Sequence, residues 1–415
     1  MDEERLSAAH GIGLCRLRDE SKRPWSYAAV AIASFVLIAA ATVPTPLYQL
    51  YQATFHFSEF MLTLIFGIYA FGVIPSLLIF GPLGDAICRR RVLMAAICTA
   101  ALGILLLALA RNVVWLLAGR LLVGVAVGAT QGNASAALVE MQPRSDRRRA
   151  GIMTAVCTAG GAATGTLISG FLAQYLPDPF TLTYLVELGM LALALVLVAS
   201  IREAASPVLS FVSFHRPRMP RGNLAAFASA SLAGGVVWSM AGLFLALLPS
   251  YVSHLLHTRN LAAGGALVAL MLGSSVLLQI LLVHVSNIRL LMSGLTASII
   301  GLAALVASWH LSSLTLMIAG AVISGCAIGM AYLGSISEIN RLASPDERGD
   351  VNSLYFVTVY LFFSIPTMAM GFAATHLGLY VAMLTFAGVI ATIALMIMAW
   401  LAILWLNDKR ANLQS

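Results

Sequence analysis

The sequence predicts an all-α membrane protein in which twelve transmembrane helices form two related six-helix bundles. Hydrophobic residues make up 60% of the 415 residues and charged residues only 10%, whereas soluble domains carry about 25% charged residues. Apolar runs of about 20 residues, long enough to cross about 30 Å of hydrocarbon, recur along the chain. Short patterns of the first half also return about 200 residues later, as expected for an internal repeat.

Twelve apolar runs define the predicted helices. They cover residues 26–49, 58–80, 92–110, 113–139, 151–175, 180–201, 224–251, 262–284, 288–308, 312–337, 350–374 and 379–406. Prolines and arginines in the segment 202–223 prevent a further spanning helix there. We therefore expect a tail at 1–25, six-helix bundles at 26–201 and 224–406, a central loop at 202–223 and a second tail at 407–415.

The basic residues predict the orientation of these helices. Both tails and the loops after the even-numbered helices carry almost all lysines and arginines, whereas the loops on the other side hold Arg111 and Arg259. Cytoplasmic loops are enriched in basic residues, so both termini are predicted in the cytoplasm of a multi-pass plasma (inner) membrane protein. The net charge of +7 is explained by this topology, and no nucleic-acid partner is expected.

Two pairs of segments support the internal repeat. GVAVGAT at 124–130 is echoed by GCAIGMA at 325–331, and SDRRRA at 145–150 by PDERGD at 345–350. Glu140 and Glu338 precede the two loops at similar positions. Small-residue spacing alone is common in membrane helices, but two echoes at one offset indicate two six-helix repeats.

A short hydrophilic stretch, GPLGDAICRRR at 81–91, separates the second and third predicted helices. Gly81 and Gly84 suit a tight turn at the bilayer surface. Asp85 lies close in sequence to Arg89 and Arg90, which places both charge signs on this turn.

This spacing resembles the loop between helices two and three of the major facilitator superfamily, Gly-x-Leu-(Gly/Ala)-Asp-(Arg/Lys)-x-Gly-Arg-(Arg/Lys). Ala86 and Cys88 depart from that pattern. The resemblance implies a cytoplasmic gate of Gly81, Gly84, Asp85, Arg89, Arg90 and Glu140. In it, Asp85 would face the start of the eleventh helix and Arg90 would pair with Glu140, closing the inner face. The alternative is a positive cytoplasmic turn with an incidental acid.

The fourth helix contains a charge inside the membrane. Arg120, Gly124 and Gly128 form an Arg-x-x-x-Gly-x-x-x-Gly frame that resembles a second pattern of the superfamily. A central charge costs about 2.5 to 3.5 kcal/mol on insertion scales, and it rarely faces lipid. Its helical face also carries Gln131, so we expect both residues to line a cavity. In the alternative, Arg120 reaches the outer interface.

Glu187 is the acid that lies well within a predicted helix, the sixth, at a depth comparable to Arg120. Both residues are therefore candidates for proton coupling, and they could form a pair. The alternative is that Glu187 is protonated or reaches toward headgroups, because sixth helices are peripheral in the resembled fold.

The fifth helix reads GGAATGTLISG at 160–170. It resembles the antiporter signature of the superfamily, although Thr166 and Ser169 replace a proline and a glycine. Gly161, Gly165 and Gly170 permit close helix packing, as do Gly124 and Gly128. This resemblance favours export by proton exchange.

Four further residues are candidates to line the cavity, because the resemblance implies that helices one, four, seven and ten border it; the alternative role for each is helix packing. Thr45 and Gln49 follow two prolines that should break the first helix. Trp238 lies near a helix midpoint rather than at an interface, and Tyr332 lies on the tenth helix.

Enzymatic chemistry has little support in the sequence. The two lysines lie outside any glycine-rich phosphate loop, and His254 and His257 have no nearby acid or cysteine to complete a metal site. The five cysteines lack metal-binding spacing and are expected as reduced thiols. We expect no enzymatic activity, cofactor or metal.

The resemblance implies a monomeric secondary transporter that works by alternating access. The first hypothesis is proton-coupled export of a small drug-like compound or metabolite, with protons and the lipid bilayer as partners. The second is proton-coupled uptake of a sugar or organic acid. The third is a transport-dead sensor or scaffold, against which Arg120 argues.

Overall fold

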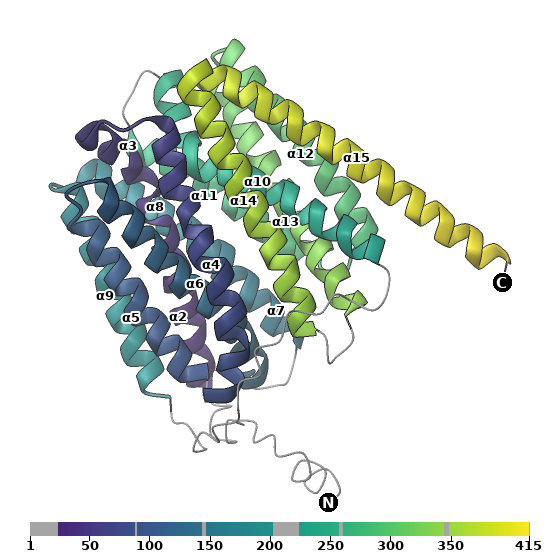
Figure 1. Cartoon of the computed structure of the whole chain (residues 1–415), viewed down its shortest axis with the longest axis horizontal. Coiled ribbons are helices and arrows are strands. Elements are labelled where there is room, and N and C mark those ends of the chain that lie inside the picture. The colour runs from purple at the N-terminus through teal and green to yellow at the C-terminus, as the bar shows by residue number, and fades with distance from the viewer. Residues whose placement is uncertain are drawn as a thin grey trace, which may run out of the picture.

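The structure is a computed structural model and describes residues 24–87, 89–142, 147–201, 224–256, 260–343 and 348–414. Twelve helical spans of these residues are long and apolar enough to cross a membrane, and they run side by side in Figure 1. The elements are α2 (Pro24–Thr42), α3 (Pro44–Phe55), α4 (Glu59–Ile87), α5 (Arg89–Ala108), α6 (Val113–Met141), α7 (Arg147–Ala155), η2 (Val156–Gly160), α8 (Gly161–Tyr175), α9 (Pro179–Ala199), α10 (Leu224–Leu256), α11 (Leu261–Leu281), α12 (Asn287–His310), α13 (Leu314–Leu342), α14 (Arg348–Leu377) and α15 (Leu379–Gln414).

The stretch 81–91 differs from its prediction as a loop. Residues 81–87 continue helix α4, and α5 begins at Arg89. The prediction was wrong because small residues suit a turn but are also tolerated in a helix that tertiary packing stabilises. The glycines therefore lie on a helix end.

The first spanning segment is broken, as its prolines predict. Helix α2 ends at Thr42 and α3 begins at Pro44. Pro44 and Pro46 have no N–H groups, so carbonyls of the preceding turn lose their usual partners. Nearby, the Ser169 hydroxyl of α8 donates to the Val43 carbonyl at 2.5 Å, which ties the break to the fifth spanning segment.

Helix five carries an irregularity that the sequence did not predict. A π-helical turn, η2, separates α7 from α8. Beyond it, Gly161 and Gly165 lie against the backbone of α2, where an added Cβ would come within 2.5 Å of the Phe35 oxygen and 2.6 Å of the Ala39 oxygen. The small residues thus permit the close packing expected of them.

The two halves repeat the same glycine contacts. A Cβ at Gly128 of α6 would lie 2.5 Å from the Val73 carbonyl oxygen of α4, and one at Gly329 of α13 would lie 2.5 Å from the Ser275 oxygen of α11. Gly124, one turn earlier on α6, also faces backbone. The sequence echo between these helices therefore corresponds to a repeated helix contact.

A tyrosine hydrogen bond repeats in the same way. The Tyr51 hydroxyl of α3 donates to the Leu107 carbonyl of α5 at 2.6 Å. The Tyr251 hydroxyl of α10 donates to the Leu305 carbonyl of α12 at 2.9 Å. These equivalent contacts lie about 200 residues apart and support two related halves.

The halves contact each other at one end of the bundle. We call the end where α6 stops and α14 begins the inner end, because the sequence predicts that it faces the cytoplasm, and the opposite end the outer end. Near the outer end, the Phe60 N–H donates to the Thr375 hydroxyl at 2.9 Å. The Leu261 N–H there donates to the Gln174 side-chain oxygen at 2.8 Å.

Glycines close the same end. Gly371 of α14 leaves no room for a Cβ against Thr63 of α4, and a Cβ at Gly170 of α8 would lie 3.0 Å from the Leu261 oxygen of α11. Helices α4 and α14, and α8 and α11, therefore seal the outer end.

Candidate functional site

A cavity of about 1060 Å³ lies between the two halves. Its walls come from α2, α4, α5, α6, α7, η2 and α8 on one side and from α10, α11, α13 and α14 on the other. It extends from Arg120 and Trp238 within the bundle to Arg89, Glu140 and Asn352 at the inner end. The outer end is sealed, whereas the lining residues Val139 and Glu140 at the inner end are exposed, so the cavity opens at the inner end.

Arg120 lines the deep part of this cavity, and it is 1% exposed. Its Nη1 donates to the Ala41 carbonyl at 2.6 Å. The guanidinium carbon lies 4.8 Å from the ring centre of Tyr69, 5.4 Å from Phe66 and 6.0 Å from Tyr48. Aromatic faces and a carbonyl thus stabilise the charge inside the membrane.

The Ala41 carbonyl lies in the last turn of α2, beside the break in the first spanning segment. Carbonyls at the C-terminal end of a helix carry partial negative charge, which favours a cation. Arg120 therefore caps a helix end inside the bundle rather than reaching the outer interface.

An aromatic wall crosses the cavity from one half to the other. On the C-terminal side, the Trp238 ring centre lies 5.8 Å from Tyr332 and 5.6 Å from Tyr360. It also lies 5.8 Å from Phe363, which in turn lies 5.1 Å from Phe66 of α4. Such pairs suit contact with an apolar or aromatic solute.

The structure brings four of the six predicted cavity residues together and leaves two elsewhere. Arg120, Gln131, Trp238 and Tyr332 line the cavity. Thr45 and Gln49 do not, which corrects their assignment. They lie on α3, beyond the helix break and toward the sealed outer end, and Thr45 is buried.

Glu187 is buried on α9, with 3% of its surface exposed, and it is outside the cavity lining. Its Oε1 has no hydrogen-bond partner among the described residues, and neither does the hydroxyl of Thr183 one turn earlier. Within the same residues, no ion pair joins Glu187 to Arg120. The pair considered from the sequence is therefore absent.

The inner end contains an ion pair with a different partner from the one expected. Arg89, the first residue of α5, lies 3.0 Å from the Glu140 carboxylate near the end of α6. Arg90 instead donates to the carbonyls of Val198 and Ala199, at 3.2 and 2.7 Å. Consecutive residues on a helix point about 100° apart, so only one of them can face α6.

This ion pair cannot close the cavity by itself, which corrects a second expectation. Both of its helices belong to the N-terminal half, and both residues line the open cavity. The side chains of Gly84 and Asp85 and the whole of Cys88 lie outside the described residues. The expected contact between Asp85 and the eleventh helix therefore stays a prediction.

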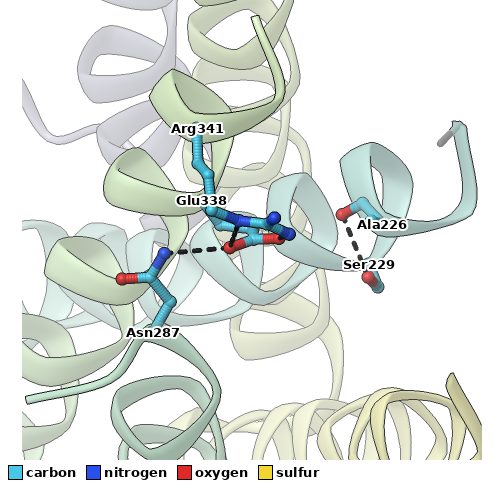
Figure 2. A network of polar contacts seen from close by, with 5 residues as sticks. All are labelled: Ala226, Ser229, Asn287, Glu338 and Arg341. Carbon is cyan, nitrogen blue, oxygen red and sulfur yellow. Dashed lines mark hydrogen bonds and ion pairs between the residues drawn. The ribbon is translucent and has the colours of Figure 1, made fainter. Parts of the chain in front are cut away.

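The C-terminal half carries a related cluster at its inner end (Figure 2). The Asn287 side chain at the start of α12 donates to Glu338 of α13 at 2.9 Å. Arg341 donates to the same carboxylate at 3.0 Å. Each half thus joins the acid of its fourth helix to the first residue of its third.

Sequence reasoning missed the aromatic residues that surround Arg120, of which Phe66 and Tyr69 line the cavity. Tyr48, Phe66 and Tyr69 surround Arg120, but aromatic residues are common in membrane helices and these three follow no motif. Asn340 and Asn352 line the inner cavity and share a hydrogen bond of 3.1 Å between α13 and α14. Their polar character inside predicted helices already marks both as lower-ranked candidates in the sequence.

The chain also resembles known proteins. The model of the Major Facilitator Superfamily matches residues 30–365. Two curated proteins from two strains of Mycobacterium tuberculosis, each named as an uncharacterized MFS-type transporter, are 30% identical over 147 residues, or 35% of this chain. That match covers 21% of the length of each relative.

Solved structures share the fold. A variant of the nucleoside transporter NupG gives a TM-score of 0.73 at 11% identity, over 90% of this chain and 99% of that one. A bacterial homolog of the human lysosomal transporter Spinster, in an inward-facing and occupied conformation, gives 0.73 at 18% identity, over 93% and 98%. Its unoccupied conformation gives 0.69 at 17% identity, over 92% and 98%.

Proposed function

The chain belongs to the Major Facilitator Superfamily, and from that premise we propose that it is a secondary transporter that exports a small organic compound in exchange for protons. The single observation that carries this proposal is the cavity between the two halves, which is sealed at the outer end and open at the inner end. Alternating access requires such a cavity, together with a second state in which the two ends exchange roles.

Glycines at the inner end support the existence of that second state. Gly81, Gly132 and Gly151 line the cavity, and a Cβ added to any of them would meet no atom within 4 Å. Packing in this conformation does not require small residues at these positions. If the inner end closed, the helices would approach each other there and would require glycine, just as the closed outer end requires it at Gly371.

Glu187 supports proton coupling. Among the described residues Glu187 has no cationic partner, and an unpaired acid in a membrane segment is typical of a proton-carrying site. Glu187 lies in the same half as Arg120, so its charge could bias the motion of that half. One proton that moves through 100 mV supplies about 2.3 kcal/mol, enough for a roughly fifty-fold gradient of a neutral solute.

Flux measurements test the function. Purified protein in sealed vesicles would be given an imposed pH gradient and a panel of fluorescent amphipathic compounds, with protein-free vesicles and a protonophore as controls. We expect at least one compound to move against its gradient as protons move the opposite way. Movement in the same direction as protons would favour uptake. If no compound moves and cysteine accessibility at the two ends never changes, the transporter proposal fails.

A further inference from the structure

We propose that the transported compound is an organic anion whose acidic group binds Arg120 and whose apolar body lies against the aromatic wall. This inference rests on the proposed function, because it assigns the substrate class of the same cavity. Three features of the cavity lead to it: an unused set of donors, an unbalanced charge, and the size and chemistry of the walls.

The first feature is the set of N–H groups in the cavity wall that have no acceptor among the described residues. A guanidinium has five N–H groups, and Arg120 uses one of them, toward the Ala41 carbonyl, among the described residues. In the part of the chain that the structure describes, its Nε has no partner although the side chain is 1% exposed. The indole Nε1 of Trp238, on the opposite half, is likewise buried without a partner there. Both residues line the cavity and can only donate, so the complementary ligand is an acceptor.

The charge is the second feature. The acids that line the described part of the cavity are Glu140 and Asp350. Glu140 is twenty residues from Arg120 on the same helix, or about 30 Å, and it pairs with Arg89. Asp350 lies in the first turn of α14, at the inner end. Among the described residues, the deep part of the cavity around Arg120 therefore holds a positive charge without a counter-ion, which disfavours cations and favours anions.

Size and surface chemistry define the rest of the ligand. Drug-sized ligands occupy pockets of about 300 to 1,000 Å³, and this cavity of about 1060 Å³ can hold one. Phe66 is part of both environments: it lies 5.4 Å from the Arg120 guanidinium and 5.1 Å from Phe363. A ligand whose acidic group binds Arg120 would therefore place its adjoining apolar part against aromatic residues of both halves. The acid could belong to a soluble aromatic acid or to a lipid-like amphipath.

A series of matched compounds tests this assignment. The series would contain several apolar groups, from indole to a dansylated alkyl chain. Each group would be prepared as the carboxylate, the neutral carboxamide and the primary amine. An alkyl phosphate of equal chain length would represent lipid-like anions. Dissociation constants would be measured on purified full-length protein in nanodiscs, with empty nanodiscs subtracted.

For at least one apolar group, we expect the carboxylate to bind about tenfold or more tightly than the matching carboxamide, because a charge-assisted hydrogen bond contributes at least a factor of ten to affinity. The matching amine should bind most weakly. A preference for short aromatic acids would indicate a soluble substrate, and a preference for the alkyl phosphate a lipid-like one. If amides or amines bind as well as the acids for every apolar group, or if nothing binds, the anion assignment is overturned.

Arg120→Gln should abolish the preference for acids, whereas Arg111→Gln, which removes the same charge from an exposed site on the outer side, should keep it. Arg120→Lys should preserve part of the preference if the glutamine variant does not fold. Persistence of the preference in Arg120→Gln would assign the anion to another site. The wild-type series is independent of flux: acids that bind without pH-driven movement would contradict the proposed coupling and leave the anion assignment intact.

Discussion

At the scale of single residues, Arg120 is the side chain whose environment most constrains the function. Its planar guanidinium contacts three rings and a carbonyl, and a lysine ammonium cannot reproduce this arrangement. We therefore expect Arg120→Ala to reduce transport at least tenfold and Arg120→Lys to restore only part of it. Folded yield, measured by size-exclusion chromatography, should stay near the wild-type level. A fully active alanine variant would show that the cavity does not use this charge.

Glu187 gives a second prediction at this scale. Glu187→Gln keeps the shape of the side chain but cannot carry a proton, so pH-driven accumulation should fall at least tenfold while downhill movement of the same compound continues. Thr183→Val is the matched control, because it removes the other partnerless polar atom of the same helix face without changing a titratable group. Normal pH-driven accumulation in Glu187→Gln would assign proton coupling to another residue.

At the scale of elements, the inner end of α4 is the part that must move against the other half. Gly81→Leu adds bulk where the present conformation has open space. It should leave this conformation stable, since a glycine in a helix interior is about 1 kcal/mol less favourable than alanine. Overpacking of the closed inner end would cost about 1 to 3 kcal/mol, which corresponds to a roughly 5- to 150-fold loss of that state.

Transport should therefore slow while the melting temperature stays equal or rises. Gly189→Leu provides the control, because Gly189 also has no atom within 4 Å of its Cβ position but lies on α9 outside the cavity. Labelling of a cysteine at Gln131 would report the state, and we expect Gly81→Leu to increase its reactivity from the inner side. Equal transport rates in the two variants would show that this end of α4 does not close.

The ion pairs at the inner end act within each half. Arg89 and Glu140 join α5 to α6, and Asn287 and Glu338 join α12 to α13. An ion pair at a partly wet surface contributes about 0 to 1 kcal/mol. These contacts therefore fix the ends of neighbouring helices, so that each half can move as a unit.

At the scale of the whole molecule, the bundle predicts a specific pattern of accessibility. With the native cysteines replaced by serine, a cysteine at Ala53 or Pro177 should react with an impermeant reagent from outside the cell. One at Ser200 should react only after the membrane is opened. All three positions are exposed in the structure. Labelling of Ser200→Cys in intact cells would reverse the proposed orientation.

The sequence alone determined the helices of this protein, because the hydrocarbon thickness fixes how long an apolar run must be. It also indicated the internal repeat through the echo between residues 124–130 and 325–331. In the structure, Gly128 and Gly329 of these segments hold equivalent positions against the backbones of α4 and α11. The break before Pro44 was likewise predictable, because proline removes a backbone donor whatever its surroundings.

Tertiary structure decided which side chains meet. Whether Arg89 or Arg90 faces Glu140, whether Thr45 reaches the cavity, and which rings surround Arg120 all depend on the rotation of each helix about its axis. That rotation is set by packing between helices far apart in the sequence, and the uniformly apolar runs do not encode it locally. The sequence therefore located the charge in the membrane, and only the packing of the two halves left it without a counter-ion in the wall of a cavity.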